Sequence, residues 1–148
     1  MKNLFFFIML LFAASCNHKV YSPSTVNDST TEEGTIRIHS TGFGASGIGA
    51  YNNAEENAFS MLLYKGVPES VQSTPLIPDE NSALQQHPDV MACFKDKKCY
   101  SQFLTKASKE GEKTKVKDGY QSASDVTINL RALRSYLEKN NVIRKFGY

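Results

Sequence analysis

The sequence predicts a small α+β domain in which an antiparallel sheet of about three strands packs against two main helices, with a helical insertion. Two observations come from apolar spacing: side chains alternate at residues 36–39 and 124–130, and each of these strands is followed by a segment with helical periodicity. The third is the predicted order of elements: strand, helix, helical insertion, strand, strand, helix. This order is typical of an α+β domain.

The N-terminus predicts export. Lys2 supplies a positive charge, residues 4–12 form an unbroken apolar run, and small residues follow, so we expect a secretory signal peptide over residues 1–15. The run is too short for a comfortable membrane span, which needs about 20 apolar residues. Cys16 comes directly after the small residues, and this arrangement resembles the lipobox of bacterial lipoproteins.

The resemblance to a lipobox implies that Cys16 carries lipid on its sulfur and becomes the mature N-terminus. Ala13, Ala14 and Ser15 fit the recognition positions, although lipoproteins prefer leucine where this chain has Ala13. The alternative is an ordinary signal peptide followed by a cysteine without a lipid.

After the signal, residues 16–33 are rich in Ser, Thr and Asn, which predicts a flexible tether. Residues 34–148 then have the length of one domain. The formal net charge of the chain is +2, and cleavage before Cys16 would remove Lys2 and lower it by one. This balance argues against a nucleic-acid partner, which would call for a basic face.

The central unit of the domain is a strand, a glycine-rich turn and a helix. Residues 36–39 form the strand, and four glycines within residues 42–49 interrupt regular structure. We expect the helix to begin near Asn53, with Asn52 or Asn53 as the cap, and to end at Lys65. Gly66 suits the left-handed position after the helix, and Pro68 prevents its continuation.

Residues 42–47 match the dinucleotide-binding pattern G-x-G-x-x-G, but their context does not fit it. A second buried strand ending in an acid should follow about 20 residues on. The chain instead has Val67 and Pro68 there, so we expect no nucleotide. The glycines are then a flexible turn or a close approach of the backbone to a partner.

The rest of the domain follows in order. Residues 69–86 are a long loop anchored by Leu76 and Ile77, with one short helical turn that Asn81 or Ser82 could cap. Two short helices are expected within residues 88–109. A weak edge strand at 114–120, a stronger strand at 124–130 and a helix capped by Asn129 and running to Asn140 complete the domain.

Cys93 and Cys99 are separated by five residues. If Cys16 carries lipid, these two remain as a pair in an oxidising compartment, so we expect a disulfide between them. The alternative is a metal-binding pair, which would need further ligands, and His87 is the one nearby. A thioredoxin-type redox motif has two residues between its cysteines and does not fit.

We predict no catalytic residues, no cofactor and no metal site. The histidines are dispersed: His18 lies in the tether, His39 alternates outward on the first strand, and His87 precedes a proline. Acids interrupt the five lysines within residues 106–117, which favours a solvated face over a patch for lipid headgroups or polyanions. The chain is therefore not expected to be an enzyme.

Two segments, Ala-Glu-Glu-Asn-Ala-Phe at 54–59 and Leu-Leu-Tyr-Lys-Gly-Val-Pro at 62–68, resemble a group of uncharacterised envelope lipoproteins of the Bacteroidetes. The stretches 126–133, 137–138 and 142–147 resemble the same group. The chain is similar, more distantly, to the small strand–helix–strand–strand–helix domain of flagellar-assembly and outer-membrane lipoproteins. This resemblance implies a fold and a location but no active site, and the cysteine pair departs from the group.

The function that we expect is a lipid-anchored domain that faces the periplasm, on the outer membrane, and docks onto a protein complex of the cell envelope without catalysis. One alternative is an exported hydrolase or a lipoprotein that binds a small ligand or glycan. Another is an accessory lipoprotein of a contractile, type VI-like secretion system. The expected partners are the membrane, through the lipid on Cys16, and an envelope protein.

Overall fold

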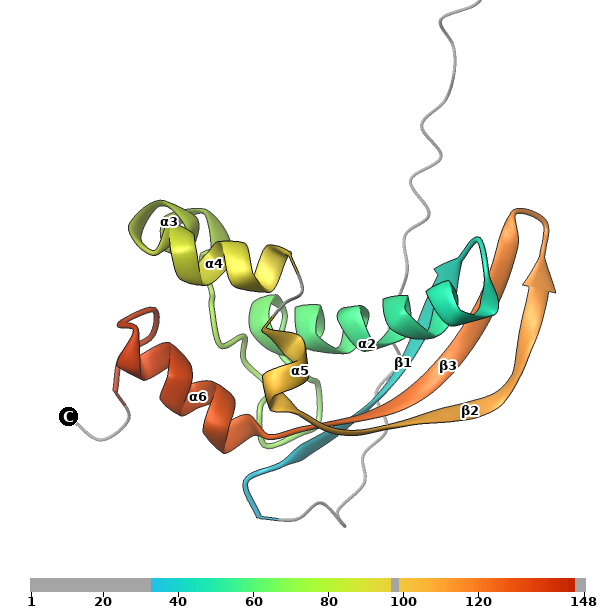
Figure 1. Cartoon of the computed structure of the whole chain (residues 1–148). Helices are drawn as coiled ribbons and strands as arrows, with labels where there is room; N and C mark the ends of the chain where they lie inside the picture. The colour runs from blue at the N-terminus through green and yellow to red at the C-terminus, as the bar shows by residue number, and fades with distance from the viewer. Residues whose placement is uncertain (1–32, 97–98, 146–148) are drawn as a thin grey trace, which may run out of the picture.

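The computed structural model describes residues 33–96 and 99–145. Its elements, in chain order, are β1 (Ile36–Gly44), α2 (Gly47–Tyr64), α3 (Glu80–Gln86), α4 (Pro88–Lys95), α5 (Tyr100–Phe103), β2 (Leu104–Val116), β3 (Gly119–Ile128) and α6 (Leu130–Lys139). The sheet order is β1-β3-β2, and both pairings are antiparallel. Figure 1 shows α2 lying along one face of the sheet, with α3, α4 and α6 toward one end. The predicted α+β fold with a three-stranded antiparallel sheet and a helical insertion is confirmed.

The predicted signal peptide at 1–15, Cys16 and the predicted tether, apart from its last residue, lie outside the described residues. Within 33–96 and 99–145, none of the helices is long and apolar enough to cross a membrane.

Strand β1 follows the predicted alternation. Ile36 and Ile38 are buried under α2, whereas Arg37 and His39 lie on the opposite face. The same pattern runs along β3, where Val126 and Ile128 are buried. Because paired residues of an antiparallel sheet share a face, Ile38 opposite Val126 forms a continuous apolar layer for α2.

Helix α2 begins six residues earlier than predicted. Its cap is Ser46, whose hydroxyl accepts a hydrogen bond from the backbone N–H of Gly49 at 3.1 Å, and not Asn52 or Asn53. The expected glycine-rich turn over residues 42–49 is therefore wrong, because β1 continues through Gly44 and the turn is only two residues long. The expected end is confirmed: the helix stops at Tyr64, and Gly66 has φ +81°.

The glycines of β1 allow close packing. A Cβ atom on Gly42 would lie 2.2 Å from the backbone oxygen of Ala50 and 2.2 Å from the backbone nitrogen of Ala54. The backbone of α2 therefore rests directly on β1, and glycine is required there by contact and not by turn geometry.

The segment before β3 differs most from expectation. The second of the two helices expected within 88–109 is reduced to the four residues of α5, and β2 begins at Leu104, ten residues before the predicted edge strand at 114–120. Most residues of β2 are exposed and polar, so its sequence has no apolar alternation that would predict a strand. Its hydrogen bonds to β3 hold it in the extended conformation.

Helix α6 matches its prediction. The Asn129 side chain caps it by accepting from the N–H of Ala132 at 2.9 Å, and the helix ends at Lys139. Leu130, Leu133 and Leu137 are buried against the core. The short helix α3 has Asp79 as its cap, in place of the predicted Asn81 or Ser82, because the Asp79 carboxylate accepts from the N–H of Ser82.

Candidate functional site on the outer face of the sheet

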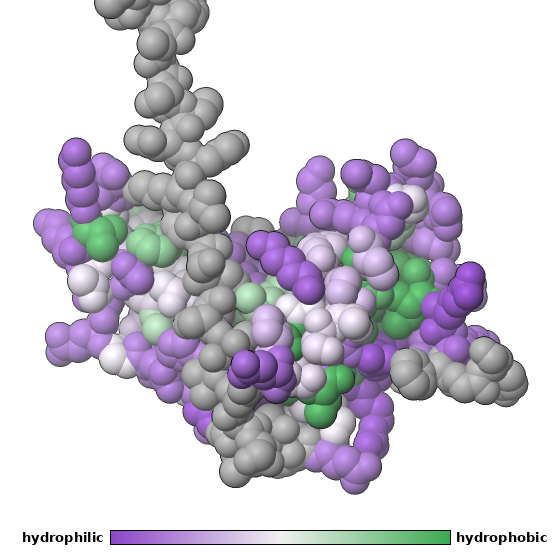
Figure 2. All heavy atoms as spheres, turned by 180° about the vertical axis from the view of Figure 1, so that it is seen from behind, coloured by the Kyte–Doolittle hydropathy of each residue, from purple (hydrophilic) through white to green (hydrophobic). Residues whose placement is uncertain are grey.

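Helix α2 covers one face of the sheet, and side chains of all three strands point to the other, which we call the outer sheet face. Strand register and alternation place on it the residues Arg37, His39, Thr41, Phe43, Lys106, Ser108, Glu110, Thr114, Gln121, Ala123, Asp125 and Thr127. Most are polar or charged, and both signs of charge occur. Seen from behind in Figure 2, hydrophilic side chains dominate the surface of the described residues, and the hydrophobic ones form separate patches.

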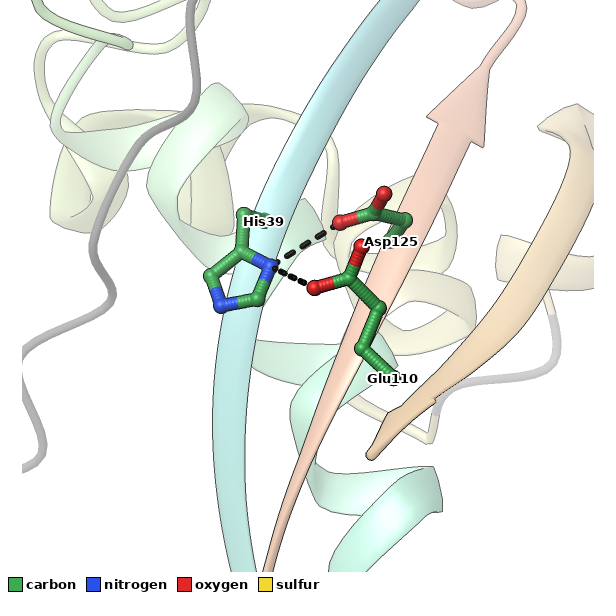
Figure 3. A group of neighbouring side chains, drawn as sticks. All are labelled: His39, Glu110 and Asp125. Carbon is green, nitrogen blue, oxygen red and sulfur yellow. Dashed lines mark hydrogen bonds and ion pairs between the residues drawn. The ribbon is translucent and has the colours of Figure 1, made fainter. Parts of the chain in front are cut away.

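Three ionisable side chains converge at the middle of this face. His39 and Asp125 are directly opposite in the β1–β3 ladder, and the Nδ1 atom of His39 lies 2.9 Å from an oxygen of Asp125. The same Nδ1 atom lies 3.0 Å from an oxygen of Glu110, which comes from β2. Figure 3 shows both carboxylates directed at this one nitrogen. Each strand of the sheet thus contributes one member.

Asp125 is the most buried of the three, with 4% of its side chain exposed. The guanidinium of Arg37 donates a hydrogen bond to its second oxygen. Burial raises the pKa of Asp125, but hydrogen bonds with His39, Arg37 and Glu110 and the charge of Arg37 together hold that pKa below its ordinary value of 3.8. The carboxylate is therefore ionised at neutral pH.

This order of residues does not fit a serine-hydrolase triad. Ser108 lies opposite Asp125 on the β2 side, so the aspartate stands between the serine and His39. In a triad the histidine must lie between the nucleophile and the acid, because it takes the proton from the hydroxyl. The arrangement can instead bind a cation or a proton.

A second feature lies among the helices, where α2, α3, α4 and α5 surround a pocket of about 280 Å³. It is lined by Glu56, Asn57, Ser60, Tyr64, Glu80, Leu84, Met91, Phe94, Lys95 and Tyr100. Its mixture of aromatic and charged side chains suits a small polar molecule with an apolar face. Burial raises the pKa of the Tyr64 hydroxyl to about 12 and also raises the pKa of Tyr100, so both stay protonated.

Cys93 and Cys99 are bonded to each other in the structure, with their Cα atoms 5.4 Å apart. The bridge links the end of α4 to the start of α5. Phe94 and Tyr100, the residues that follow the two cysteines, both line the pocket. The disulfide therefore holds together two segments of the pocket wall. The alternative metal ligand, His87, caps α4 at its other end.

Sequence reasoning found the cysteine pair but missed the cluster of His39, Glu110 and Asp125. One signal was present: Asp125 is a charged residue within the apolar alternation of a predicted strand. Its neighbour Glu110 could not be predicted, because no strand was expected at that position. The five lysines of 106–117 are all exposed along β2 and after it, as expected of a solvated face.

Comparisons of the chain with protein-family models, with curated proteins and with solved structures found no match.

Proposed function

We propose that this chain is a lipid-anchored domain of the cell envelope that binds a protein partner in the periplasm and catalyses no reaction. The observation that carries the proposal is the outer sheet face, which spans three strands and bears polar groups of both charge signs. A polar face of mixed charge complements the surface of another protein, whereas a lipid surface would favour an apolar or uniformly basic one.

Two sequence features support the location. The apolar leader and Cys16 suit export and lipidation, and the polar stretch at 16–33 suits a tether that lets the domain reach a partner. The resemblance to envelope lipoproteins of the Bacteroidetes points the same way. The aspartate-centred order on the outer sheet face favours binding over hydrolysis.

Native electrophoresis of gently solubilised membranes tests the partner. The full chain should migrate in a complex well above its own mass of 16.5 kDa. Thr127→Arg, which places a bulky charge on the outer sheet face, should release it to monomer size. Ser135→Arg, at an exposed position of α6, is the matched control and should leave the complex intact. Migration of the wild-type chain at monomer size, or release by both variants alike, would contradict the proposal.

The pocket favours a second candidate function, the binding of a small ligand or glycan. Its aromatic wall can pack on an apolar face of a sugar while Glu56 and Glu80 accept hydrogen bonds. Calorimetric titration of the full chain with a sugar panel should then show saturable binding of one compound. Glu56→Gln should weaken that binding, and Asp89→Asn on exposed α4 should not. A panel without saturable binding would remove this candidate.

A further inference from the structure

The cluster on the outer sheet face has an imbalance between its donor and its acceptors. An imidazole Nδ1 carries at most one hydrogen, yet two carboxylate oxygens approach the Nδ1 atom of His39, at 2.9 and 3.0 Å. One proton cannot form a well-aligned hydrogen bond to both oxygens.

The three atoms are placed as ligands of one ion would be. His39 Nδ1, one oxygen of Asp125 and one oxygen of Glu110 lie within 4.8 Å of one another. Ligands at Zn²⁺ distances of about 2.0–2.1 Å in a tetrahedron are separated by about 3.3–3.4 Å. The observed separations at His39 are only a few tenths of an ångström shorter. Glu110, 46% exposed, has room to move outward by that amount.

The surroundings support such a role. His39 and Asp125 are fixed by strand register, and a β-bulge follows Glu110, where the pairing jumps from Glu110 opposite Ala123 to Thr114 opposite Gln121. Bulges of this kind re-aim a side chain at the edge of a site. Arg37 holds one oxygen of Asp125 and leaves the other for His39, as outer partners of metal ligands do.

We infer that His39, Asp125 and Glu110 form a binding site for a divalent transition-metal cation, represented by Zn²⁺, on the outer sheet face. One imidazole nitrogen with two carboxylate oxygens suits Zn²⁺ and its neighbours in the first row better than Mg²⁺ or Ca²⁺, which prefer oxygen alone. Three protein ligands leave a further position open to solvent or to a residue of another protein. The site does not depend on the proposed docking function.

Calorimetric titration of the chelator-treated full chain with ZnCl₂ tests the site. The wild-type chain should bind one equivalent in a saturable manner, and MgCl₂ in equal amount should compete poorly. Glu110→Gln and His39→Gln should each weaken the binding about tenfold or more. Glu112→Gln, an exposed acid on the same strand, and His87→Gln are the matched controls and should bind as the wild type does.

The melting temperature gives an independent readout, because an ion that binds the folded state raises it. Zn²⁺ should raise the melting temperature of the wild type and of Glu112→Gln by similar amounts, and that of Glu110→Gln by clearly less. Circular dichroism checks that Glu110→Gln, changed at a half-exposed side chain, keeps the fold. The inference is overturned if the wild type shows no saturable binding at millimolar Zn²⁺. It is also overturned if Glu110→Gln and His39→Gln both bind like the wild type, or if His87→Gln abolishes binding.

Discussion

Asp125 shows how a single charged residue is accommodated inside a sheet. It is almost fully buried, and burial alone would favour the neutral form of its carboxyl group. Arg37 and His39, its neighbours on β1, supply the hydrogen bonds that favour the charged form. The ionised carboxylate therefore stabilises the folded state, and this stabilisation depends on pH.

The sign of that dependence follows from the lowered pKa. Because the folded pKa of Asp125 lies below the ordinary value of 3.8, its contribution is present above that value and is lost as pH falls through the folded pKa. Asp125→Asn should lower the free energy of unfolding at pH 7 by about 1–3 kcal/mol, and the difference from wild type should shrink as pH falls below the ordinary value of 3.8. Urea titrations at pH 7 and at low pH measure both effects.

The control for this prediction is Glu112→Gln, which removes an acid from exposed β2 and should leave the unfolding free energy nearly unchanged at both pH values. A constant difference between Asp125→Asn and wild type across the pH range would show that the carboxylate charge has no part in stability.

At the scale of elements, the contact between α2 and β1 organises the fold. Ala50 and Ala54 face Gly42 and Gly44, so small residues on both sides let a helix lie against a strand at backbone contact. Two side chains of α2 also form hydrogen bonds with the backbone of β1. Asn53 accepts from the N–H of Phe43, and Asn57 donates to the carbonyl of Thr41. The larger apolar residues of α2 fill the core beyond this contact.

Gly42→Ala tests this close approach. Its new Cβ atom would lie 2.2 Å from the backbone of α2, and backbone atoms cannot yield as a flexible side chain can. We expect a loss of about 3 kcal/mol or more in unfolding free energy, as for severe overpacking. Gly49→Ala is the matched control, because its Cβ atom would lie 3.3 Å from the Ser46 hydroxyl and alanine favours a helix. Equal stabilities of the two variants would show that the helix can move away at little cost.

The disulfide joins two short helices, α4 and α5, whose aromatic side chains Phe94 and Tyr100 also contact each other. Closing so short a loop should contribute about 2 kcal/mol, so reduction should weaken the domain without unfolding it, because the main core lies under α2. Mass spectrometry of the exported chain, alkylated without reductant, should find Cys93 and Cys99 unmodified. A denaturant titration with and without reductant measures the stability. Alkylation of both residues in the unreduced protein would refute the bridge in the exported chain.

At the scale of the whole molecule, the sheet carries α2 on one face and a polar cluster on the other. The described domain begins at Glu33, beside the start of β1, so a lipid at Cys16 would hold it by the N-terminal side of that strand. A tether of the length of 16–33 reaches on the order of 20–25 Å. If Cys16 carries lipid as proposed, the anchor would restrict the domain to the vicinity of the membrane within that reach.

Cys16→Ser tests the anchor. Without the sulfur there is no site for the lipid, so the chain should move from the membrane fraction to the soluble fraction or accumulate with its leader uncleaved. Cell fractionation and metabolic labelling with a fatty acid measure the two effects. Cys93→Ser is the control and should stay in the membrane fraction with its label. Unchanged fractionation and labelling of Cys16→Ser would contradict the lipoprotein prediction.

Local sequence patterns were sufficient for the elements that depend on neighbours in the chain. The apolar spacing and Asn129 cap of α6, the left-handed Gly66 after α2, and the alternation of β1 and β3 were all predictable, since each depends on residues within a few positions. The exposed, polar strand β2 was not, because β3 supplies its hydrogen bonds. The glycines of β1 were predicted to form a turn, because the sequence does not show that they contact the backbone of α2. Only the tertiary structure brought together His39, Glu110 and Asp125, whose positions in the chain lie as far as 86 residues apart, because strand register decides which side chains meet.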